Sequence, residues 1–313
     1  MKAPFALVAL ACVALAACTS QPDTRHLVVF SQCNNSEPYR AAQNDTMKRL
    51  WAREPDTRLV VMDAQQDSVR QIAQIETAIR MKPQLLIVAP NERAPLTEVM
   101  KRATEAHIPV ICLERDIVQP HYASWIRADN REIGRMVGRY VVEALTKKYG
   151  EPRGRIVELA GLKGVEGEIN RREGAHEIWA ACPKIEIVTE AVANWSQSLG
   201  KDRMTEILSA VPQIDVVYGR NDPMAVGAWL AARERGREKE MIFVGVDGLS
   251  GEAGGVSKVR EGVLAATCIY PLCVDKAVEV GTKILHDPAF VPEKQYTIDS
   301  TLVTAENAGR FAP

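Results

Sequence analysis

Short runs of apolar residues alternate along the chain with longer amphipathic stretches. The first set of runs is Leu27–Phe30, Leu59–Met62, Leu85–Val88 and Val110–Leu113. Between them, apolar residues recur three or four positions apart, as in Ile72, Ile75 and Ile79, which is the spacing of one helix face. Continuous apolar strands that alternate with helices are typical of a parallel sheet covered on both faces.

The same alternation repeats in the rest of the chain. A helical pattern with Ile133, Val137 and Val141 on one face comes first. The strands expected after that helix are Ile156–Leu159, Ile185–Val188, Val216–Tyr218, Ile242–Val246 and Leu264–Ile269. No low-complexity linker separates the two sets. The pattern therefore predicts an α/β protein with two doubly wound, Rossmann-like lobes.

The N-terminal residues form a separate segment with the features of an export signal. Lys2 is followed by Phe5–Ala17, which is almost wholly apolar but too short to span a bilayer. The segment ends in Leu15-Ala16-Ala17-Cys18, which resembles the lipobox of bacterial lipoproteins. This resemblance implies a signal peptide over residues 1–17, lipidation of Cys18 and a tether over residues 18–25. The alternative is ordinary signal cleavage beside an incidental cysteine.

Composition and motifs exclude several classes of protein. The 313 residues are enough for two domains of ordinary size. The formal net charge of -1 argues against a nucleic-acid partner, because nucleic-acid-binding proteins usually carry a basic surplus. The sequence has no CxxC, GxSxG or Walker motif, and none of its 5 histidines stands in a metal-binding motif. We therefore expect no metal, no cofactor and no enzyme activity.

Polar and aromatic side chains follow the ends of several predicted strands. In open α/β sheets, ligands bind beyond the carboxyl ends of the strands. The segments at these ends are FSQCNNSEPYR after the first strand and, further on, Glu114-Arg115-Asp116, Ala193-Asn194-Trp195, Gly219-Arg220-Asn221-Asp222 and Asp247-Gly248. Each has a purely structural alternative, such as a helix cap at Asn221-Asp222-Pro223 or a turn at Asp247-Gly248.

The chemistry of these groups fits a sugar. The turn after the first strand has no glycine, unlike a phosphate-binding turn, but it offers Tyr39, Arg40 and several amides. Carboxylates accept hydrogen bonds from hydroxyls, guanidiniums donate them in a planar fork, and aromatic rings cover the C–H face of a sugar. Together, these groups predict a site for a polyhydroxylated, uncharged ring.

From about Leu27 to about Thr304, the chain resembles bacterial periplasmic sugar-binding proteins of the ribose- and galactofuranose-binding type, the substrate-binding components of ABC importers. The residues that carry the likeness are Phe30-Ser31-Gln32, Tyr39-Arg40-Ala41-Ala42, Glu158-Leu159-Ala160-Gly161 and Asn170-Arg171. The resemblance implies the type I periplasmic binding protein fold, in which two lobes are joined by three crossing strands and close on the ligand like a hinge.

The resemblance also implies domain boundaries and ligand-binding positions. The crossings are expected near Ala128-Asp129, Tyr270-Pro271 and Phe290-Val291. This gives an N-terminal lobe of residues 26–128 plus 271–290 and a C-terminal lobe of residues 129–270 plus 291–313. The ligand-binding residues that it implies are Tyr39, Arg40, Glu114, Arg115, Asp129, Asn130, Arg171, Trp195, Asn221, Asp222, Asp247 and Tyr270.

These positions carry three guanidiniums and four carboxylates, a balance that suits a neutral ligand. The resemblance therefore implies an extracytoplasmic binding protein that captures a neutral monosaccharide, furanose or pentose-like, and delivers it to the membrane permease of an ABC importer. We expect a monomer in the periplasm or at the cell surface, anchored to the membrane by lipid. The alternative is a sensory sugar-binding protein that reports to a chemoreceptor or a receptor kinase.

Overall fold

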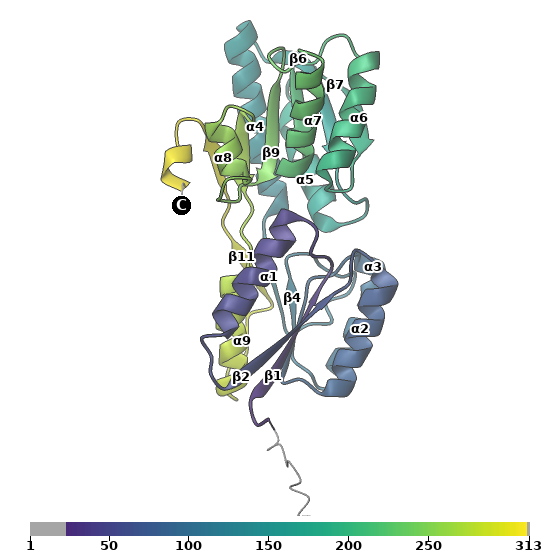
Figure 1. Ribbon diagram of the computed structural model, residues 1–313, viewed down its shortest axis with the longest axis vertical. Helices are drawn as coiled ribbons and strands as arrows, with labels where there is room; N and C mark the ends of the chain where they lie inside the picture. The colour runs from purple at the N-terminus through teal and green to yellow at the C-terminus, as the bar shows by residue number, and fades with distance from the viewer. Residues whose placement is uncertain (1–22, 312–313) are drawn as a thin grey trace, which may run out of the picture.

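Two α/β lobes, stacked end to end, make up the computed structural model, which describes residues 23–311 (Figure 1). The predicted signal peptide and Cys18 lie outside the described residues. Within residues 23–311, no helix is both long and apolar enough to cross a bilayer. Each lobe contains a 6-stranded sheet with helices on both faces, which confirms the fold class predicted from the alternating apolar runs.

The N-terminal lobe is built on a sheet with the strand order β11-β5-β4-β3-β1-β2, parallel throughout. Its strands are β1 (His26–Gln32), β2 (Thr57–Asp63), β3 (Leu85–Val88), β4 (Val110–Leu113), β5 (Ser124–Ala128) and β11 (Gln295–Ile298). Its helices are α1 (Pro38–Trp51), α2 (Ser68–Met81), α3 (Arg93–Glu105) and α9 (Val274–His286). Alternate side chains of β1 enter two cores: Val29 packs with α2 and α3, whereas Val28 and Phe30 pack with α1 and α9.

The C-terminal lobe has the strand order β12-β10-β9-β8-β6-β7, and only β12 is antiparallel to its neighbour. Its strands are β6 (Arg153–Ala160), β7 (Lys184–Val192), β8 (Val216–Gly219), β9 (Ile242–Asp247), β10 (Ala266–Ile269) and β12 (Thr301–Thr304). Its helices are α4 (Asn130–Tyr149), α5 (Glu166–Trp179), α6 (Gln197–Ala210), α7 (Asp222–Glu234), α8 (Gly255–Arg260) and the 3-10 helix η1 (Ala308–Phe311). On β6, Ile156 packs with α4 and α5, and Val157 packs with α6 and α7.

The chain passes between the lobes at three places. β5 leads into α4 at Asp129, and β10 leads back to α9 through residues 270–273. The third passage lies between β11 and β12, at Asp299-Ser300, and not near Phe290-Val291 as predicted, because β11 pairs with β5 in the N-terminal sheet. β11 is a short edge strand whose side chains are half-buried or exposed, so the sequence has no apolar run that would reveal it.

Two glycines let α4 and α5 cross at close range, and this crossing fixes the position of Arg171. A Cβ atom on Gly134 would overlap the carbonyl oxygen of Arg171, and one on Gly174 would overlap the carbonyl oxygen of Arg131. The two backbones approach this closely only because both positions lack a side chain. The crossing therefore holds Arg171, on the second turn of α5, beside the point where the chain enters the C-terminal lobe.

Candidate functional site

The carboxyl ends of the two sheets face each other across a cleft between the lobes. The residues that line the cleft are Glu37, Tyr39, Arg40, Glu114, Arg115, Val165, Gly167, Arg171, Trp195, Asn221, Asp247 and Tyr270. All the residues predicted to bind ligand are therefore in its lining, apart from Asp129, Asn130 and Asp222. The free space among the lining side chains is about 20 Å³, room for roughly one water molecule. The lobes are thus closed on each other, and a larger ligand enters only when they separate.

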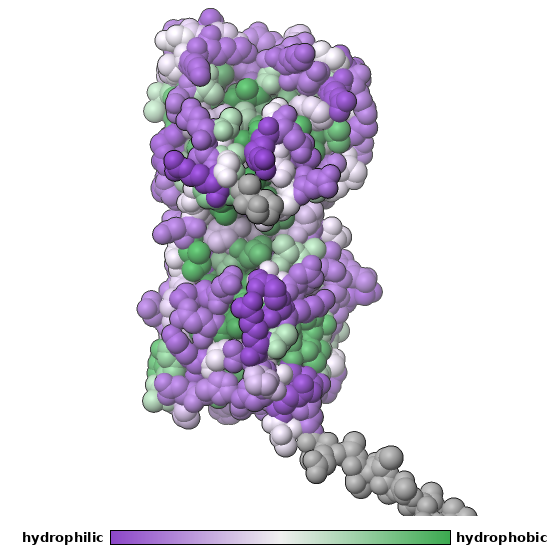
Figure 2. Space-filling model, turned by 60° about the vertical axis from the view of Figure 1, so that its left-hand side comes forward, coloured by the Kyte–Doolittle hydropathy of each residue, from purple (hydrophilic) through white to green (hydrophobic). Residues whose placement is uncertain are grey.

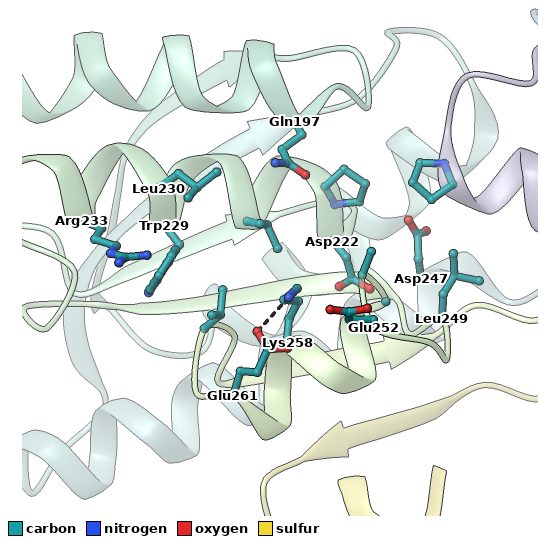
Figure 3. Close-up of a pocket in the computed structure, with 17 residues that line it drawn as sticks. Gln197, Asp222, Trp229, Leu230, Arg233, Asp247, Leu249, Glu252, Lys258 and Glu261 are labelled. Carbon is teal, nitrogen blue, oxygen red and sulfur yellow. Dashed lines mark hydrogen bonds and ion pairs between the residues drawn. The ribbon is translucent and has the colours of Figure 1, made fainter. Parts of the chain in front are cut away.

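A larger hollow of about 570 Å³ adjoins the cleft, mostly on the C-terminal lobe, and shares Asp247 with it. α7 supplies Trp229 and Leu230 to this hollow, and the segment between β9 and α8 supplies Leu249 and Glu252 (Figure 3). Three arginines, from both lobes, and two tyrosines converge in the cleft, whereas the hollow is lined by a single arginine, Arg233, and by no tyrosine. We therefore place the candidate binding site in the cleft.

Glu114 is the carboxylate at the centre of the N-terminal wall. It follows β4 in a left-handed conformation, with φ 64°, and is 4% exposed. The Arg40 guanidinium lies 2.7 Å from its Oε2, and the hydroxyl of Tyr270 donates to its Oε1 at 2.6 Å. Burial alone would raise the pKa of Glu114, but Arg40 and Arg115 outweigh it and hold the pKa below its ordinary value. The carboxylate is therefore charged.

Tyr270 also joins the lobes through its ring. The rings of Tyr39, on α1, and Tyr270, after β10, are stacked with their centroids 5.0 Å apart. The Tyr39 hydroxyl donates to the carbonyl oxygen of Pro271 at 2.8 Å. The guanidinium of Arg171 lies 4.2 Å from the centre of the Tyr270 ring, as a cation–π pair. The two tyrosines thus form an aromatic surface that spans the hinge.

Asn130 lies behind Arg171 and orients it. Its side-chain oxygen accepts from Arg171 Nε at 2.9 Å, and its amide donates to Glu166 at 2.6 Å. A second Arg171 nitrogen donates to the carbonyl oxygen of Arg220 at 2.7 Å. Glu166 pairs in turn with Arg127 of β5 at 2.8 Å, which ties α5 to the N-terminal sheet. Asn130 is therefore a positioning residue for the guanidinium that lines the cleft.

The position of the Trp195 ring depends on Gly161, the last residue of the Glu158-Leu159-Ala160-Gly161 segment. A Cβ atom on Gly161 would overlap the indole ring of Trp195, so the ring rests on the bare backbone at the end of β6. Trp195 has a φ of 66° and is 5% exposed, and Asn221 donates to its carbonyl oxygen at 3.1 Å. Its indole N–H has no hydrogen-bond partner among residues 23–311 and is a free donor beside the cleft.

Glu158, the first residue of the Glu158-Leu159-Ala160-Gly161 segment, belongs to a buried charge cluster under the C-terminal wall. Arg220, fully buried, lies 3.2 Å from Glu158 and also pairs with Glu168. Glu158 is 2.8 Å from His176, and Glu168 accepts from the backbone N–H of Gly161 at 2.6 Å. The cluster therefore fixes both the carbonyl oxygen that holds Arg171 and the glycine under Trp195. Arg220 follows a predicted strand in Gly219-Arg220-Asn221-Asp222, but neither it nor Glu168 was among the predicted ligand-binding residues.

Asp222 and Asp247 form an acidic pair at the C-terminal wall. Asp222 is buried and accepts from the Thr267 hydroxyl at 2.7 Å and from the Gly248 N–H at 2.8 Å. Burial raises its pKa to about 6. Asp247 reaches the cleft, and burial, together with the neighbouring Asp222, raises its pKa as well. Asp222 thus supports the loop that carries Asp247, and does not line the cleft.

Asp129 is one of the three predicted site residues outside the lining, and unlike Asn130 and Asp222 it is exposed. Its side chain is exposed and caps α4, accepting from the backbone N–H groups of Arg131 and Glu132 at 3.0 Å each. The structure adds Glu37, from the first turn, and Val165 and Gly167, from the start of α5. Glu37 belongs to FSQCNNSEPYR, the segment after the first strand. The rule that ligands bind beyond the carboxyl ends of strands could therefore have predicted it. The lining therefore contains three acidic side chains and three basic ones. The acidic side chains are Glu37, Glu114 and Asp247, and the basic ones are Arg40, Arg115 and Arg171.

The comparisons with known proteins agree with this architecture. The profile of the periplasmic binding protein domain matches residues 28–271. The chain therefore belongs to the periplasmic binding protein family, whose members are substrate-binding proteins, and the resemblance drawn from the sequence is confirmed.

Individual relatives cover most of the chain. It is similar to the ribose import binding protein of Salmonella typhimurium, with 30% identity over 78% of this chain and 79% of that protein. It is also similar to a D-apiose import binding protein of Paraburkholderia graminis, with 30% identity over 99% of this chain and 98% of that protein. Among solved structures, the fructose-binding periplasmic domain of a hybrid two-component system has a TM-score of 0.86 and 33% identity, over 92% of this chain and 93% of that one. A galactofuranose-binding protein has a TM-score of 0.84 and 26% identity, over 91% and 96%.

The raised pKa of Asp222 predicts a pH-dependent stability. Because the folded pKa of about 6 lies above the ordinary value of 3.8, the folded protein holds the proton more tightly than the unfolded chain. The proton on Asp222 therefore stabilises the folded protein by up to about 3 kcal/mol. This stabilisation is fully present below pH 3.8 and is lost as the pH rises through 6. In urea titrations between pH 4 and pH 7, wild type should therefore lose stability relative to Asp222→Asn. Parallel pH profiles for the two proteins would contradict this account.

Proposed function

We propose that this protein captures a neutral monosaccharide, furanose or pentose-like, in the cleft between its lobes and delivers it to the membrane permease of an ABC importer. The observation that carries the proposal is the convergence of paired charges and aromatic faces from both lobes on one closed cleft. The relatives named for ribose, apiose and galactofuranose support a sugar of this kind.

Each kind of group in the cleft has a role toward a sugar. Glu114 and Asp247 accept hydrogen bonds from hydroxyls, and Arg40 and Arg171 donate to hydroxyl and ring oxygens. The Trp195 indole provides an apolar face for the C–H side of the ring and a free N–H. Because hydroxyls both donate and accept, a sugar can insert between a guanidinium and a carboxylate without leaving either one unpaired.

The charge of the lining favours a neutral ligand. Glu37, Glu114 and Asp247 face the same space as Arg40, Arg115 and Arg171. The ion pair between Arg40 and Glu114 already neutralises the charge of one guanidinium in the closed form. An anionic ligand would bring its charge against these carboxylates and would have to break such pairs, at a cost of several kcal/mol.

Membrane attachment is the second part of the proposal. The Leu15-Ala16-Ala17-Cys18 segment supports a mature chain that begins at Cys18, in the periplasm or at the cell surface, with lipid on that cysteine. β1 begins at His26, at the end of the N-terminal lobe away from the cleft, so a tether of a few residues leaves the cleft free (Figure 1). We expect the protein to act as a monomer and not to be an enzyme.

A sensory role is the alternative, and one comparison favours it. The fructose-binding domain with 33% identity belongs to a hybrid two-component system. Deleting the gene separates the two roles: loss of sugar uptake supports transport, whereas intact uptake with a lost transcriptional or chemotactic response supports sensing.

A thermal-shift panel should identify a neutral sugar as the ligand. At about 100 times its dissociation constant, a ligand stabilises the folded protein by about 2.7 kcal/mol, which raises the melting temperature by several degrees. The panel sets neutral pentoses, hexoses, furanose-rich sugars and polyols against uronic acids, sugar phosphates and amino acids. A shift produced by the anionic compounds alone would overturn the charge argument.

Asp247→Asn is the matched test of the site within that panel. It should abolish the shift, because the amide replaces one acceptor of a sugar hydroxyl by a donor. Asp202→Asn, on the exposed side of α6, is the control and should keep the wild-type shift. Equal shifts in both variants would remove Asp247 from the site.

Lipidation is tested by labelling growing cells with a radioactive or clickable fatty acid. Wild type should incorporate the label and Cys18→Ala should not, because the thiol is the proposed point of attachment. More than one acyl chain is expected, since a single chain gives only marginal membrane binding. Equal labelling of wild type and Cys18→Ala would rule out the anchor.

A further inference from the structure

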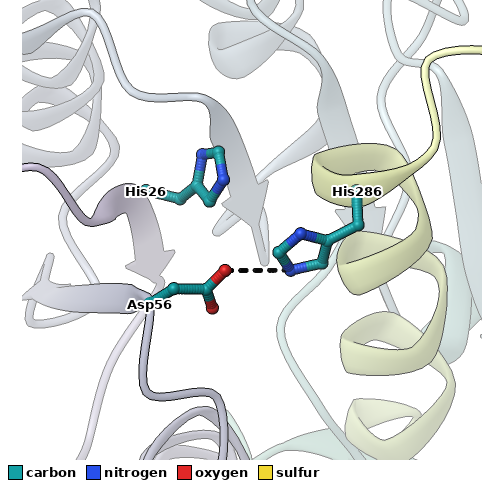
Figure 4. A group of neighbouring side chains, drawn as sticks. All are labelled: His26, Asp56 and His286. Carbon is teal, nitrogen blue, oxygen red and sulfur yellow. Dashed lines mark ion pairs between the residues drawn. The ribbon is translucent and has the colours of Figure 1, made fainter.

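Two histidines and an aspartate meet at the end of the N-terminal lobe that faces away from the cleft (Figure 4). His26 is the first residue of β1, Asp56 directly precedes β2, and His286 is the last residue of α9. Among residues 23–311, this is the one group of three or more histidine, cysteine or acidic side chains whose ligand atoms all lie within 4.8 Å of one another. Neither the proposed sugar site nor the family assignment uses these residues.

The spacing of the donor atoms matches a metal site better than a hydrogen-bonded cluster. His286 Nε2 lies 3.5 Å from Asp56 Oδ2, which is longer than an ordinary N–H···O hydrogen bond. In a tetrahedral zinc site, bonds of about 2.0–2.2 Å place neighbouring donors about 3.4 Å apart. The rings of His26 and His286 stand edge to face, with centroids 5.4 Å apart. A small rotation of the His26 side chain therefore completes a three-donor set.

The surroundings leave these donors available. The backbone N–H of His26 donates to the carbonyl oxygen of Asp56 at 2.7 Å, which fixes the two residues side by side. The nearby Arg25 and Arg58 both pair with Asp23, at 2.8 Å and 3.2 Å, and not with Asp56. Within the described part of the chain, neither imidazole has a side-chain hydrogen bond to another group. Asp56 and His286 are exposed, so an ion can reach them directly from solvent.

We propose that His26, Asp56 and His286 bind one zinc ion, with water in the remaining coordination position. Two imidazoles and a carboxylate are the donor set that this borderline-soft ion accepts in sites with an open position. The bound ion would tie the start of β1, the segment before β2 and the end of α9 to one another. It would stabilise the N-terminal lobe at the point where the proposed tether leaves it, independently of sugar binding.

The test is a calorimetric titration of zinc into the metal-free protein, purified without a polyhistidine tag. Wild type should bind one zinc ion per chain. His286→Ala and Asp56→Asn should each bind it about tenfold more weakly or worse, since losing even an outer-sphere partner of a metal ligand costs about 10- to 100-fold in affinity. His121→Ala removes a histidine that lies outside the cluster and should bind zinc as wild type does.

Cobalt(II) gives an independent readout at the same site. Its visible absorption spectrum should show one low-coordinate site in wild type and in His121→Ala, and none in His286→Ala. With zinc at about 100 times its dissociation constant, the melting temperature of wild type should rise by roughly 5 °C, and that of the two cluster variants should not. Circular dichroism before addition of metal establishes that each variant is folded. Wild type that binds no zinc, or cluster variants that bind it as tightly as wild type, would overturn the proposal.

Discussion

The buried carboxylate of Glu114 is the group on which the arrangement of the cleft depends. An unpaired charge inside a protein costs many kcal/mol, so this side chain requires its partners wherever the lobes are closed. Arg40 supplies the charge from α1, and Tyr270 supplies a hydrogen bond from the segment that connects the lobes. The carboxylate thereby couples the N-terminal wall to the hinge. A ligand hydroxyl that bonds to Glu114 would join the same network and would favour the closed form.

Local backbone strain gathers at the same place. Glu114, Trp195 and Asp247 have φ values of 64°, 66° and 136°, in a region that residues other than glycine rarely adopt. Each such residue costs about 1–3 kcal/mol and persists only where the surrounding structure holds it. Here the supports are visible: Trp125 donates to the Glu114 carbonyl oxygen at 3.0 Å, and Asn221 donates to that of Trp195 at 3.1 Å. Each wall of the site therefore keeps its local backbone conformation without a ligand.

The sequence predicted the parts of this protein that leave a local signal. Continuous apolar strands revealed the two sheets, and the positions of Glu114, Trp195 and Asp247 directly after strands predicted that they lie in one cleft. Long-range pairing left no such signal. β11 is a half-exposed edge strand, so its place in the N-terminal sheet, and with it the third crossing, could not be read from periodicity.

Two kinds of functional detail were also out of reach of the sequence. The family resemblance implied that Asp129 binds the ligand, yet its carboxylate caps α4 by accepting from the N–H groups of Arg131 and Glu132. The cluster of His26, Asp56 and His286 has no motif at all, because its members come from segments far apart in the chain. Only the folded lobe brings the end of α9 next to the starts of β1 and β2.

The central claim is that Glu114 and Tyr270 act together across the hinge when the sugar binds. A double-mutant cycle tests it most directly: the affinity of the neutral sugar is measured by calorimetry for wild type, Glu114→Gln, Tyr270→Phe and the double variant. The account predicts that the two single losses do not add, with a coupling energy of about 0.5–3 kcal/mol. Losses that add to within about 0.3 kcal/mol would show that the two residues contribute independently, and would contradict it.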